Sequence, residues 1–531
     1  MTSPPGLPPE PPRVAPDRVR ADVAIVGAGI AGLYAAVRLP DGLDVVVVDK
    51  GVPGGDSGSS PWAQGGLAAA VGPHDSPASH AHDTMVAGDG LCDPLAVDVL
   101  TREAPRHIEV LVDLGARFDR VGRDDGAGAG LEGLDLAREG GQHVARSVRR
   151  ADATGAEVVR VLRAAAAPRV TRLAGIVRSL ARDRAGRVTG LWVLAGGSLV
   201  GLEAKAVLLA TGGCGGLFAA TTNPDQATGD GLAMAAEAGA VIRDAEFVQF
   251  HPTGLAVAGS WRFLLTEALR GAGATLHDAD GRRFLLDRHP DAELAPRHVV
   301  AKAILDRPGG TAYLDATHLS EHDLQREFPT VLAGARQHGF DLATERVPVT
   351  PAAHYQVGGV RADLDGRTSL PGLYAAGEVA STGVHGANRL AGNSLAEAMV
   401  FGARTAATMA AELPDRHVGL GAEPAVATTG TEAGAALRGE LRDAMLRGAG
   451  PVRTGAALEA LGRRLATLTS ELGTPAASTD AIELHHAVRA GALIVRAALL
   501  RTESRGGHWR EDHPDADPNW AGVHLDQVGL P

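Results

Sequence analysis

Two short apolar runs enclose a glycine-rich segment near the start of the chain. The first run, residues 21–26 (ADVAIV), leads into GAGIAG at residues 27–32, and a helical pattern (LYAAVRL) follows. The second run, residues 44–50 (DVVVVDK), ends in an acidic and a basic residue. Uninterrupted valine-rich strands are typical of a parallel sheet that is buried on both faces. The pattern therefore predicts a strand–turn–helix–strand unit within about 30 residues.

The middle of the chain predicts two kinds of structure in succession. Residues 94–118 predict a helix, and residues 154–210 predict a helix followed by strands. After residue 245 the pattern changes to a hairpin-like stretch at 279–284 (ADGRRF) and a helix at 295–306 (APRHVVAKAILD). The strand–glycine pattern then returns in VGGV and GLYAAGEVA. This order indicates that one domain is inserted into another.

The C-terminal part predicts a small helical bundle over residues 431–500, after a linker at 413–430 that is rich in Pro, Gly and Thr. Asp480 and Glu483 resemble a capping box at the start of a helix, with aspartate in place of the usual Ser or Thr. A preceding helix carries one apolar stripe with spacings of three and four residues. Its members are Leu458, Leu461, Leu465, Leu468 and Leu472.

Composition limits the classes of function. The 531 residues suffice for two to four domains of about 100–200 residues each. A formal net charge of −12 argues against general binding to nucleic acid or to an anionic membrane. No apolar run reaches the roughly 18 residues that span a bilayer. The proline-rich residues 1–18 predict a disordered tail and not a signal peptide.

Cysteine usage points to a reducing compartment. Only Cys92 and Cys214 are present, and they lie far apart in the sequence. This excludes a disulfide scaffold and a cysteine-rich zinc site, so that we expect a cytoplasmic protein without a metal ion.

The GAGIAG segment has the features of a dinucleotide-binding turn. Gly27 permits the tight turn, Gly29 lets the backbone approach a pyrophosphate, and Gly32 allows close packing of helix on strand. The diphosphate then lies at the positive end of the helix dipole. An ordinary glycine turn is the alternative. Asp49, 17 residues after Gly32, favours the dinucleotide, because it is placed to accept hydrogen bonds from a ribose. The predicted contacts are Gly27, Ala28, Gly29, Ile30, Ala31 and Gly32, with Asp49 and Lys50 after the second strand.

Four further motifs favour FAD over NAD. They are SSPWAQGG at 59–66, LLATGG at 208–213, GLYAAGE at 372–378, and a helix that begins at 393–395. The buried strand of the third motif delivers Glu378 to ribitol hydroxyls, and the free N–H groups of the fourth suit the negative charge of a reduced flavin. Each motif alone could be an ordinary turn, but their order along one chain supports FAD. The predicted contacts are Ser59, Ser60, Ala63, Gln64, Gly65, Gly66, Glu378, Ser394 and Leu395.

Taken together, the motifs resemble those of the L-aspartate oxidases, within the wider succinate dehydrogenase/fumarate reductase flavoprotein group. The resemblance spans residues 20–513 and rests on GAGIAG, AQGG, AREGGQH, TGDG, FVQFHPT, LLTEALRG, APRHVVA, PAAHYQVGGV, GEVASTGVHGANRLAGNSL and RTESRGGHWRED. It implies an α/β fold: a Rossmann-like FAD-binding domain, an inserted α+β capping domain and a C-terminal helical bundle. It also implies that Asp230 of TGDG contacts FAD.

The resemblance gives the following expected division of the chain: a tail at 1–18, an FAD-binding domain at 19–244 and 358–412, a capping domain at 245–357, a linker at 413–430, and a C-terminal helical domain with its tail at 431–531. The active site is expected between the flavin and the cap.

Two positions guide the choice within the group. Respiratory members carry flavin covalently on a histidine, and the matching position here is Ser59, so the resemblance implies non-covalent FAD. Glu139 in AREGGQH matches the glutamate that faces the substrate amino group in aspartate oxidases. A carboxylate there suits an ammonium and repels a plain dicarboxylate such as succinate.

The resemblance also assigns a cationic substrate site, although a typical Arg or His is a solvated surface residue. Arginine grips a carboxylate with a planar fork of donors, so two arginines hold both ends of a four-carbon diacid. The candidates are His251, Thr266, Arg270, Arg297, His354 and Arg389. Glu267 and Arg270 have the alternative of forming a helical i, i+3 pair in the wall. His143 and His385 are candidates for a supporting layer, and His80 and His82 for structural roles.

One position departs from the family pattern. This chain has Gly392 where the family often has Ser, so that a hydroxyl contact to the substrate is lost or replaced. The arginine at the position of Arg297 is the family's proton donor or acceptor, but an arginine with a pKa above about 12 is a poor base, and an electrostatic clamp is the alternative.

The implied reaction oxidises L-aspartate to iminoaspartate, with O2 reduced to H2O2 or fumarate to succinate. It opens NAD biosynthesis and supplies quinolinate synthase. Two alternatives remain at this stage: a soluble fumarate reductase or succinate dehydrogenase flavoprotein, and an FAD-binding scaffold without a competent site.

Overall fold

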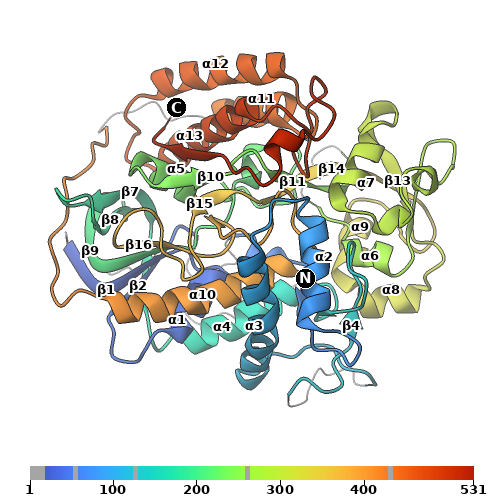
Figure 1. Cartoon of the computed structure of the whole chain (residues 1–531), viewed down its shortest axis with the longest axis horizontal. Coiled ribbons are helices and arrows are strands. Elements are labelled where there is room, and N and C mark those ends of the chain that lie inside the picture. The colour runs from blue at the N-terminus through green and yellow to red at the C-terminus, as the bar shows by residue number, and fades with distance from the viewer. Residues whose placement is uncertain (1–17, 52–57, 123–129, 258–262, 428–434, 531) are drawn as a thin grey trace.

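The protein is built around one large mixed sheet with helices on its lower side (Figure 1). A computed structural model describes residues 18–51, 58–122, 130–257, 263–427 and 435–530. Of the predicted segments, nearly all of the tail, the end of the linker and the start of the C-terminal part lie outside these ranges.

The sheet has the order β6-β2-β1-β9-β8-β7, with β16 beside β9. The pairs β1–β2, β1–β9, β2–β6 and β9–β16 are parallel, whereas β7, β8 and β9 form antiparallel pairs. The predicted valine-rich strands β1 and β2 are therefore paired in parallel, and β2 is buried along four of its five residues. The strands are β1 (Arg18–Val26), β2 (Val45–Asp49), β6 (Thr171–Ala174), β7 (Ile176–Arg182), β8 (Val188–Ala195), β9 (Ser198–Leu209) and β16 (Leu373–Ala375).

Helices pack below and beside this sheet, and Figure 1 shows α1, α4 and α10 beneath it. The helix α1 packs against both α10 and α4, and α3 packs against α2 and α10. Tyr34 and Phe401 are fully buried in the core that they enclose. The helices are α1 (Ile30–Arg38), α2 (Pro77–Ala87), α3 (Pro94–Asp113), α4 (Thr154–Ala166) and α10 (Asn393–Glu412), and a small sheet of β3 (Leu67–Ala68), β4 (Leu136–Ala137) and β5 (Ser147–Val148) lies beside them.

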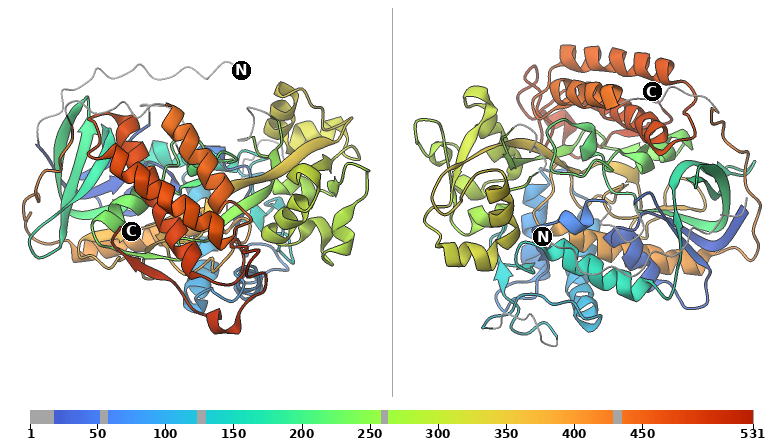
Figure 2. Two further views of the ribbon diagram at one scale, coloured as in Figure 1. Left: turned by 90° about the horizontal axis from the view of Figure 1, so that it is seen from above. Right: turned by 180° about the vertical axis from the view of Figure 1, so that it is seen from behind.

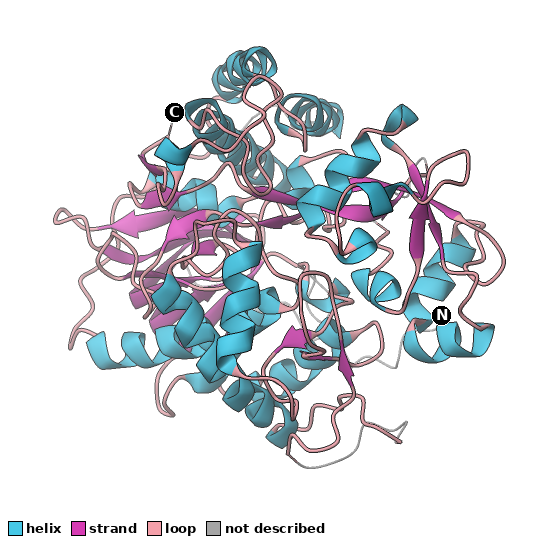
Figure 3. Ribbon diagram, turned by 45° about the vertical axis from the view of Figure 1, so that its right-hand side comes forward, coloured by secondary structure: helices cyan, strands magenta, loops and turns pink. Residues whose placement is uncertain are grey.

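A second lobe lies on the right of Figure 1, and Figure 3 shows its separate sheet in magenta. Its sheet has the order β11-β14-β13-β12, and its core is a hydrophobic cluster of its own. Because β16 pairs with β9, the chain returns to the large sheet after this lobe. The elements are β11 (Val248–Leu255), α6 (Glu267–Gly271), β12 (Thr275–His277), α7 (Arg297–Leu305), β13 (Ala312–Asp315), α8 (Glu321–Glu327), α9 (Pro329–Gln337) and β14 (Val347–Gln356).

The C-terminal helices lie on the other side of the large sheet, as Figure 2 shows from above and behind. They are α11 (Ala435–Ala449), α12 (Gly455–Leu472) and α13 (Thr479–Leu500), which pack against one another. The predicted leucine stripe is confirmed: four of its leucines are buried, and Leu472 is partly buried against them. Below them lie α5 (Asp230–Glu237) and a sheet of β10 (Val241–Arg243), β15 (Gly359–Arg361), β17 (Ala380–Ser381) and β18 (Asp526–Val528). Among the described residues, no helix has both the length and the apolar character that a membrane span requires.

The helix predicted at 94–118 is confirmed from Pro94 to Asp113, and two other local predictions were wrong. The confirmed helix ends before Gly115, which adopts a positive φ of 93°. Residues 279–284 form a tight turn that runs into a 3₁₀ helix and not a pair of strands. The helix predicted to begin at Asp480 begins at Thr479, because Ser478 caps it by accepting a hydrogen bond from the Ala481 N–H. The Glu483 carboxylate does not cap this helix and instead pairs with Lys50.

Candidate active site

One large cavity of about 690 Å³ lies between the large sheet and the second lobe. Its size is within the range of about 300–1,000 Å³ that is typical of ligand sites. The structure brings nearly all of the predicted site residues to its wall. Those that line it are Gly27, Ala28, Gly29, Ile30, Ala31, Asp49, Lys50, Ser59, Ser60, Ala63, Gln64, Gly65, Gly66, Glu139, Asp230, His251, Thr266, Arg297, His354, Glu378, Arg389, Gly392, Ser394 and Leu395.

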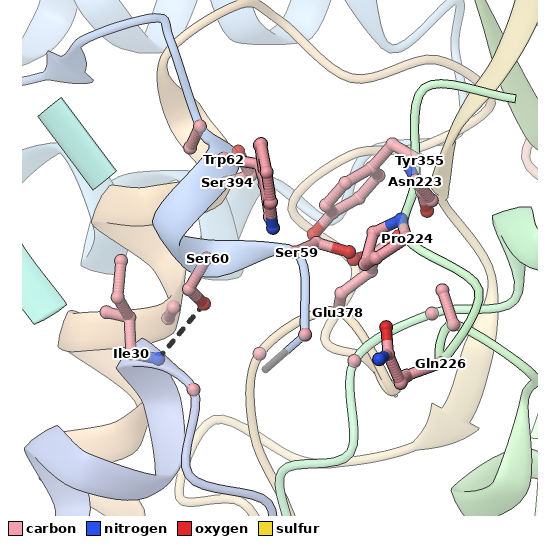
Figure 4. A pocket seen from close by; sticks show the side chains of 18 of the residues that line it. Ile30, Ser59, Ser60, Trp62, Asn223, Pro224, Gln226, Tyr355, Glu378 and Ser394 are labelled. Atoms are coloured by element: carbon pink, nitrogen blue, oxygen red, sulfur yellow. Dashed lines mark hydrogen bonds between the residues drawn. The ribbon is translucent and has the colours of Figure 1, made fainter. Parts of the chain in front are cut away.

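The glycine turn forms a close-packed edge of the cavity. Gly27 has a φ of +107°, and a Cβ there would lie 2.3 Å from the Ala210 carbonyl oxygen. Gly32 is absent from the cavity wall, and a Cβ there would lie 2.1 Å from the Gly27 carbonyl oxygen. Gly32 therefore serves packing, as the fingerprint requires. The Ile30 N–H, at the start of α1, donates to the Ser60 hydroxyl at 3.2 Å (Figure 4).

Glu378 supplies a buried carboxyl to the same cavity (Figure 4). It accepts a hydrogen bond from the Gln356 N–H at 2.9 Å, and burial raises its pKa to about 7. A carboxyl near its pKa at neutral pH both accepts and donates hydrogen bonds, which suits vicinal hydroxyls. This feature, together with the glycine turn, fits a dinucleotide that carries a polyol.

The helix α10 begins at the cavity without a side-chain cap. Its N-cap is Gly392, with a φ of +81°, and Ser394 and Leu395 of the first turn line the wall. Uncapped N–H groups and the helix dipole favour negative charge. A Cβ on Gly392 would lie 2.9 Å from the Ala68 Cβ, so a serine does not fit this backbone unless its neighbours shift.

Two buried arginines form the cationic end of the cavity. The Gln249 side-chain oxygen accepts from Arg297 Nη1 at 3.0 Å and from Arg389 Nη2 at 3.1 Å, and so holds the two guanidinium groups together. The Arg389 guanidinium also donates to the Ser394 hydroxyl and lies 4.4 Å from the centre of the Tyr355 ring. Burial and then the neighbouring Arg297 lower the pKa of Arg389 to about 10, so it stays protonated at neutral pH.

Glu267 balances one of these charges. Its carboxylate accepts from Arg297 Nε at 2.7 Å and from Arg270 Nη2 at 2.7 Å. Burial raises the pKa of Glu267, but the two arginines outweigh this effect and hold the pKa below its usual value. The prediction that Arg270 faces the substrate was wrong, since Arg270 lies behind the wall and bonds to Glu267 and to the Glu293 carbonyl. The alternative, an i, i+3 pair in the wall, is confirmed.

Two histidines lie beside the arginines. The His251 and His354 rings are 5.0 Å apart, and burial, followed by the positive charge of Arg297, holds both pKa values well below the usual range. Both imidazoles are therefore neutral at pH 7. His251 Nδ1 accepts from the Thr253 N–H at 3.3 Å, which leaves Nε2 as the protonated donor. His354 Nδ1 contacts the Thr222 hydroxyl at 2.8 Å.

Glu139 and Thr266 complete this end of the cavity. The Glu139 carboxylate accepts from the Gly66 N–H at 2.9 Å, and burial raises its pKa. A Cβ on Gly65 would lie 3.2 Å from a Glu139 oxygen, so the AQGG loop lies directly against the carboxylate. Thr266 caps α6, because its hydroxyl accepts from the Ala268 N–H.

The other histidines that the sequence singled out, His80, His82, His143 and His385, do not line the cavity. His143 is exposed and pairs with the buried Asp83, and the His82 ring lies beside it at a tilt. His80 is buried against Asn393. His385 is buried between Tyr355 and Glu397.

Sequence reasoning missed Gln249 and Tyr355, which support the arginines. Gln249 is two residues before His251 on β11, so both side chains point to the same face of the strand. That alternation is the signal from which Gln249 could have been predicted. Tyr355 follows His354 directly, and no spacing rule distinguished it from a core residue.

Two family models match the chain. The FAD binding domain model matches residues 22–395, and the fumarate reductase flavoprotein C-terminal model matches residues 438–527. The cavity lies almost wholly within the first match, which is consistent with the glycine turn and the buried carboxyl described above.

Solved structures confirm the predicted α/β fold with a capping sheet and C-terminal helices. A variant of E. coli quinol fumarate reductase superposes with a TM-score of 0.86 at 32% identity, covering 97% of this chain and 96% of that chain. Sdh1 of Mycobacterium smegmatis in complex with UQ1 superposes with a TM-score of 0.80 at 32% identity, covering 97% of this chain and 94% of that chain.

Curated relatives narrow the family. The L-aspartate oxidase of Caulobacter vibrioides is 47% identical over 502 residues, which cover 93% of this chain and 94% of the relative. That of Streptomyces coelicolor is 45% identical over 534 residues, which cover 94% of this chain and 90% of the relative. With this similarity over nearly its whole length, and with a cationic cavity beside a dinucleotide turn, the chain belongs to the L-aspartate oxidase family of FAD-binding flavoproteins.

Proposed function

We propose that this protein binds FAD without a covalent bond and oxidises L-aspartate to iminoaspartate, with O2 reduced to H2O2 or fumarate reduced to succinate. The observation that carries the proposal is the pair of guanidinium groups on Gln249, with the Glu139 carboxyl at the same end of the cavity. The relatives named as L-aspartate oxidases support the same substrate.

The arginines bind the diacid. Glu267 neutralises one guanidinium, so the pair of arginines keeps a surplus positive charge for the substrate carboxylates. The neutral His251 and His354 add hydrogen bonds without adding charge. Thr266 and the backbone at Gly392 complete the substrate contacts. Each charge-assisted hydrogen bond contributes about 1.5–3 kcal/mol, which suffices to hold both ends of the diacid without a metal ion.

Glu139 selects the amino acid. Burial raises the pKa of the Glu139 carboxyl, and among the described residues no ion pair joins it to a cation. The substrate ammonium supplies such a partner. FAD, when bound, supplies the two-electron oxidant for the Cα–H bond. In the same reaction the substrate ammonium loses one proton to give the protonated imine, and a second when that imine becomes neutral. Glu139 is a better acceptor for the first proton than Arg297, whose guanidinium already donates to Glu267 and Gln249. Arg297 acts in this proposal as an electrostatic clamp.

The products fit a place in NAD biosynthesis. Iminoaspartate is unstable in water, so an enzyme such as quinolinate synthase must consume it promptly. The domain division predicted from sequence is part of the same proposal: a cap at 245–357 that contributes Arg297 and His251 to a cofactor site on the rest of the chain.

Anaerobic reduction of the flavin tests the substrate. Excess L-aspartate should bleach the 450 nm flavin band (roughly where oxidised flavins absorb) within seconds, whereas succinate should leave it unchanged. Bleaching by succinate and not by aspartate would instead support a fumarate reductase or succinate dehydrogenase. A protein that holds FAD but is reduced by neither diacid would be a scaffold without a competent site.

Glu139→Gln tests the selection of the amino group. The variant should lose about ten-fold or more in kcat/KM for L-aspartate, because the ammonium loses its counter-charge, and succinate should become a stronger competitive inhibitor. Steady-state kinetics with peroxide detection measure both effects. Glu132→Gln, at an exposed position of the same segment, is the control. Unchanged inhibition by succinate would remove Glu139 from the substrate site.

Arg297→Lys tests the clamp. Lysine keeps the charge but loses the planar fork that bonds Glu267 and Gln249 together, so we expect kcat/KM to fall about 100-fold, equivalent to about 2.7 kcal/mol. Arg346→Lys, on the surface of the same lobe, should behave as the parent. Parent-like kinetics of the Arg297 variant would contradict the proposed clamp.

Acid precipitation tests the non-covalent attachment of FAD. Ser59 lines the cavity but has no nucleophilic ring nitrogen, so trichloroacetic acid should release all the flavin into the supernatant and leave a colourless pellet. A yellow pellet would show a covalent bond to another side chain.

A further inference from the structure

Lys50 lies at the cavity wall, yet its ammonium group is fully used by the protein. Lys50 Nζ donates to the Thr228 hydroxyl at 2.8 Å and to Asp230 at 2.6 Å, and it pairs with Glu483 at 2.8 Å. An ammonium has three N–H donors and no acceptor. All three donors therefore point to protein oxygens, and none is left for a phosphate or a ribose of a bound cofactor.

The third partner comes from the C-terminal helices. Glu483 lies in the second turn of α13, which the family comparison places in a separate C-terminal unit. Its carboxylate also accepts from Arg438 of α11 at 3.1 Å. One turn further along α13, His486 Nδ1 lies 3.4 Å from Asp230. The bundle thus reaches the cavity wall at Lys50 and at Asp230.

This contact lies at one defined end of the cavity. Lys50 directly follows Asp49, the last residue of β2, and in a dinucleotide fold the ribose of the adenosine half lies there. Asp230 begins α5 and lines the same wall. The position of Lys50 and Asp230 therefore shapes the region that an adenosine group would occupy.

The cluster is electrostatically balanced although it is buried. Burial lowers the pKa of Lys50, but Asp230 and Glu483 outweigh this effect and raise it. Burial likewise raises the pKa of Asp230, and Lys50 and then His486 bring it below its usual value. Two carboxylates face two cations, Lys50 and Arg438, so removal of one carboxylate leaves a buried positive charge without its partner.

We propose that the C-terminal bundle sets the affinity for FAD, because Glu483 holds Lys50, and through it Asp230, in the position that the adenosine half of the cofactor requires. Glu483 is a positioning residue and does not itself touch FAD. The inference rests on the FAD-binding domain and not on the identity of the substrate. An absence of aspartate oxidation would therefore leave it untouched.

The test titrates apoprotein with FAD and follows flavin fluorescence. Glu483→Gln keeps the shape and the hydrogen-bonding capacity of the side chain but removes its charge, and we expect the dissociation constant for FAD to rise at least five-fold. Turnover at saturating FAD should fall far less than the affinity, because the cationic end of the cavity is unchanged. Asp480→Asn, one turn earlier on α13 and exposed, should bind FAD as the parent does.

A double-mutant cycle separates this role from a general effect on stability. If Glu483 acts through Lys50, Glu483→Gln should have no further effect on FAD affinity in a Lys50→Met background. A purely structural role would lower the melting temperature of apoprotein and holoprotein equally and would add to the effect of Lys50→Met. Parent-like FAD binding by the Glu483→Gln protein, or additive effects in the cycle, would overturn the proposal. Should Glu483→Gln not fold, Arg438→Gln, which weakens the same carboxylate from the other side, gives the same readout.

Discussion

The site depends on two buried guanidinium groups that are held side by side. Like charges in a region of low dielectric repel, so the arrangement needs acceptors that bridge them and a counter-charge behind them. Gln249 provides the bridge, and Glu267 provides the charge, itself held by Arg270. Burial, followed by the positive charge of the arginines, lowers the pKa of the neighbouring His251 and His354 and keeps both neutral. A substrate with two carboxylates relieves the remaining repulsion, so this end of the cavity suits a diacid.

Glycines allow the charged groups to come this close. A Cβ on Gly140 would lie 2.3 Å from a Glu267 oxygen, and Gly65 lies against Glu139 in the same way. The glycines of the AREGGQH and AQGG segments therefore admit two carboxylates into a space that side chains would fill. Glycine is thus needed at the cationic end of the cavity as much as at the dinucleotide turn.

Much of this arrangement was predictable from local patterns. The GAGIAG turn, the paired valine strands, the leucine stripe of α12 and the start of α10 each have a short-range signal, and the structure shows them as predicted. The motifs likewise predicted that Arg297 and Arg389 belong to one site, and both line the same cavity. Local patterns did not predict which groups bond to each other: Gln249 joins Arg297 and Arg389, which lie 48 and 140 positions away, and Arg270 bonds the Glu293 carbonyl, 23 positions away. The predicted capping box is absent for the same reason: the Glu483 carboxylate pairs with Lys50, which lies 433 positions earlier in the chain.

The choice of side chain at Lys50 follows from the geometry of its partners. The chain has 51 lysines and arginines, of which only Lys50, Lys205 and Lys302 are lysines. From composition alone, this scarcity of lysine is interpreted as coding bias. An arginine fork lies in one plane and suits a carboxylate approached edge-on, as at Arg297. At Lys50 the acceptors come from three directions, from Thr228, Asp230 and Glu483, and a tetrahedral ammonium meets all three. A planar guanidinium is also larger and would extend into the cavity. The same physical reasoning that favours arginine at the substrate end therefore favours lysine at the end where the bundle meets the cofactor site.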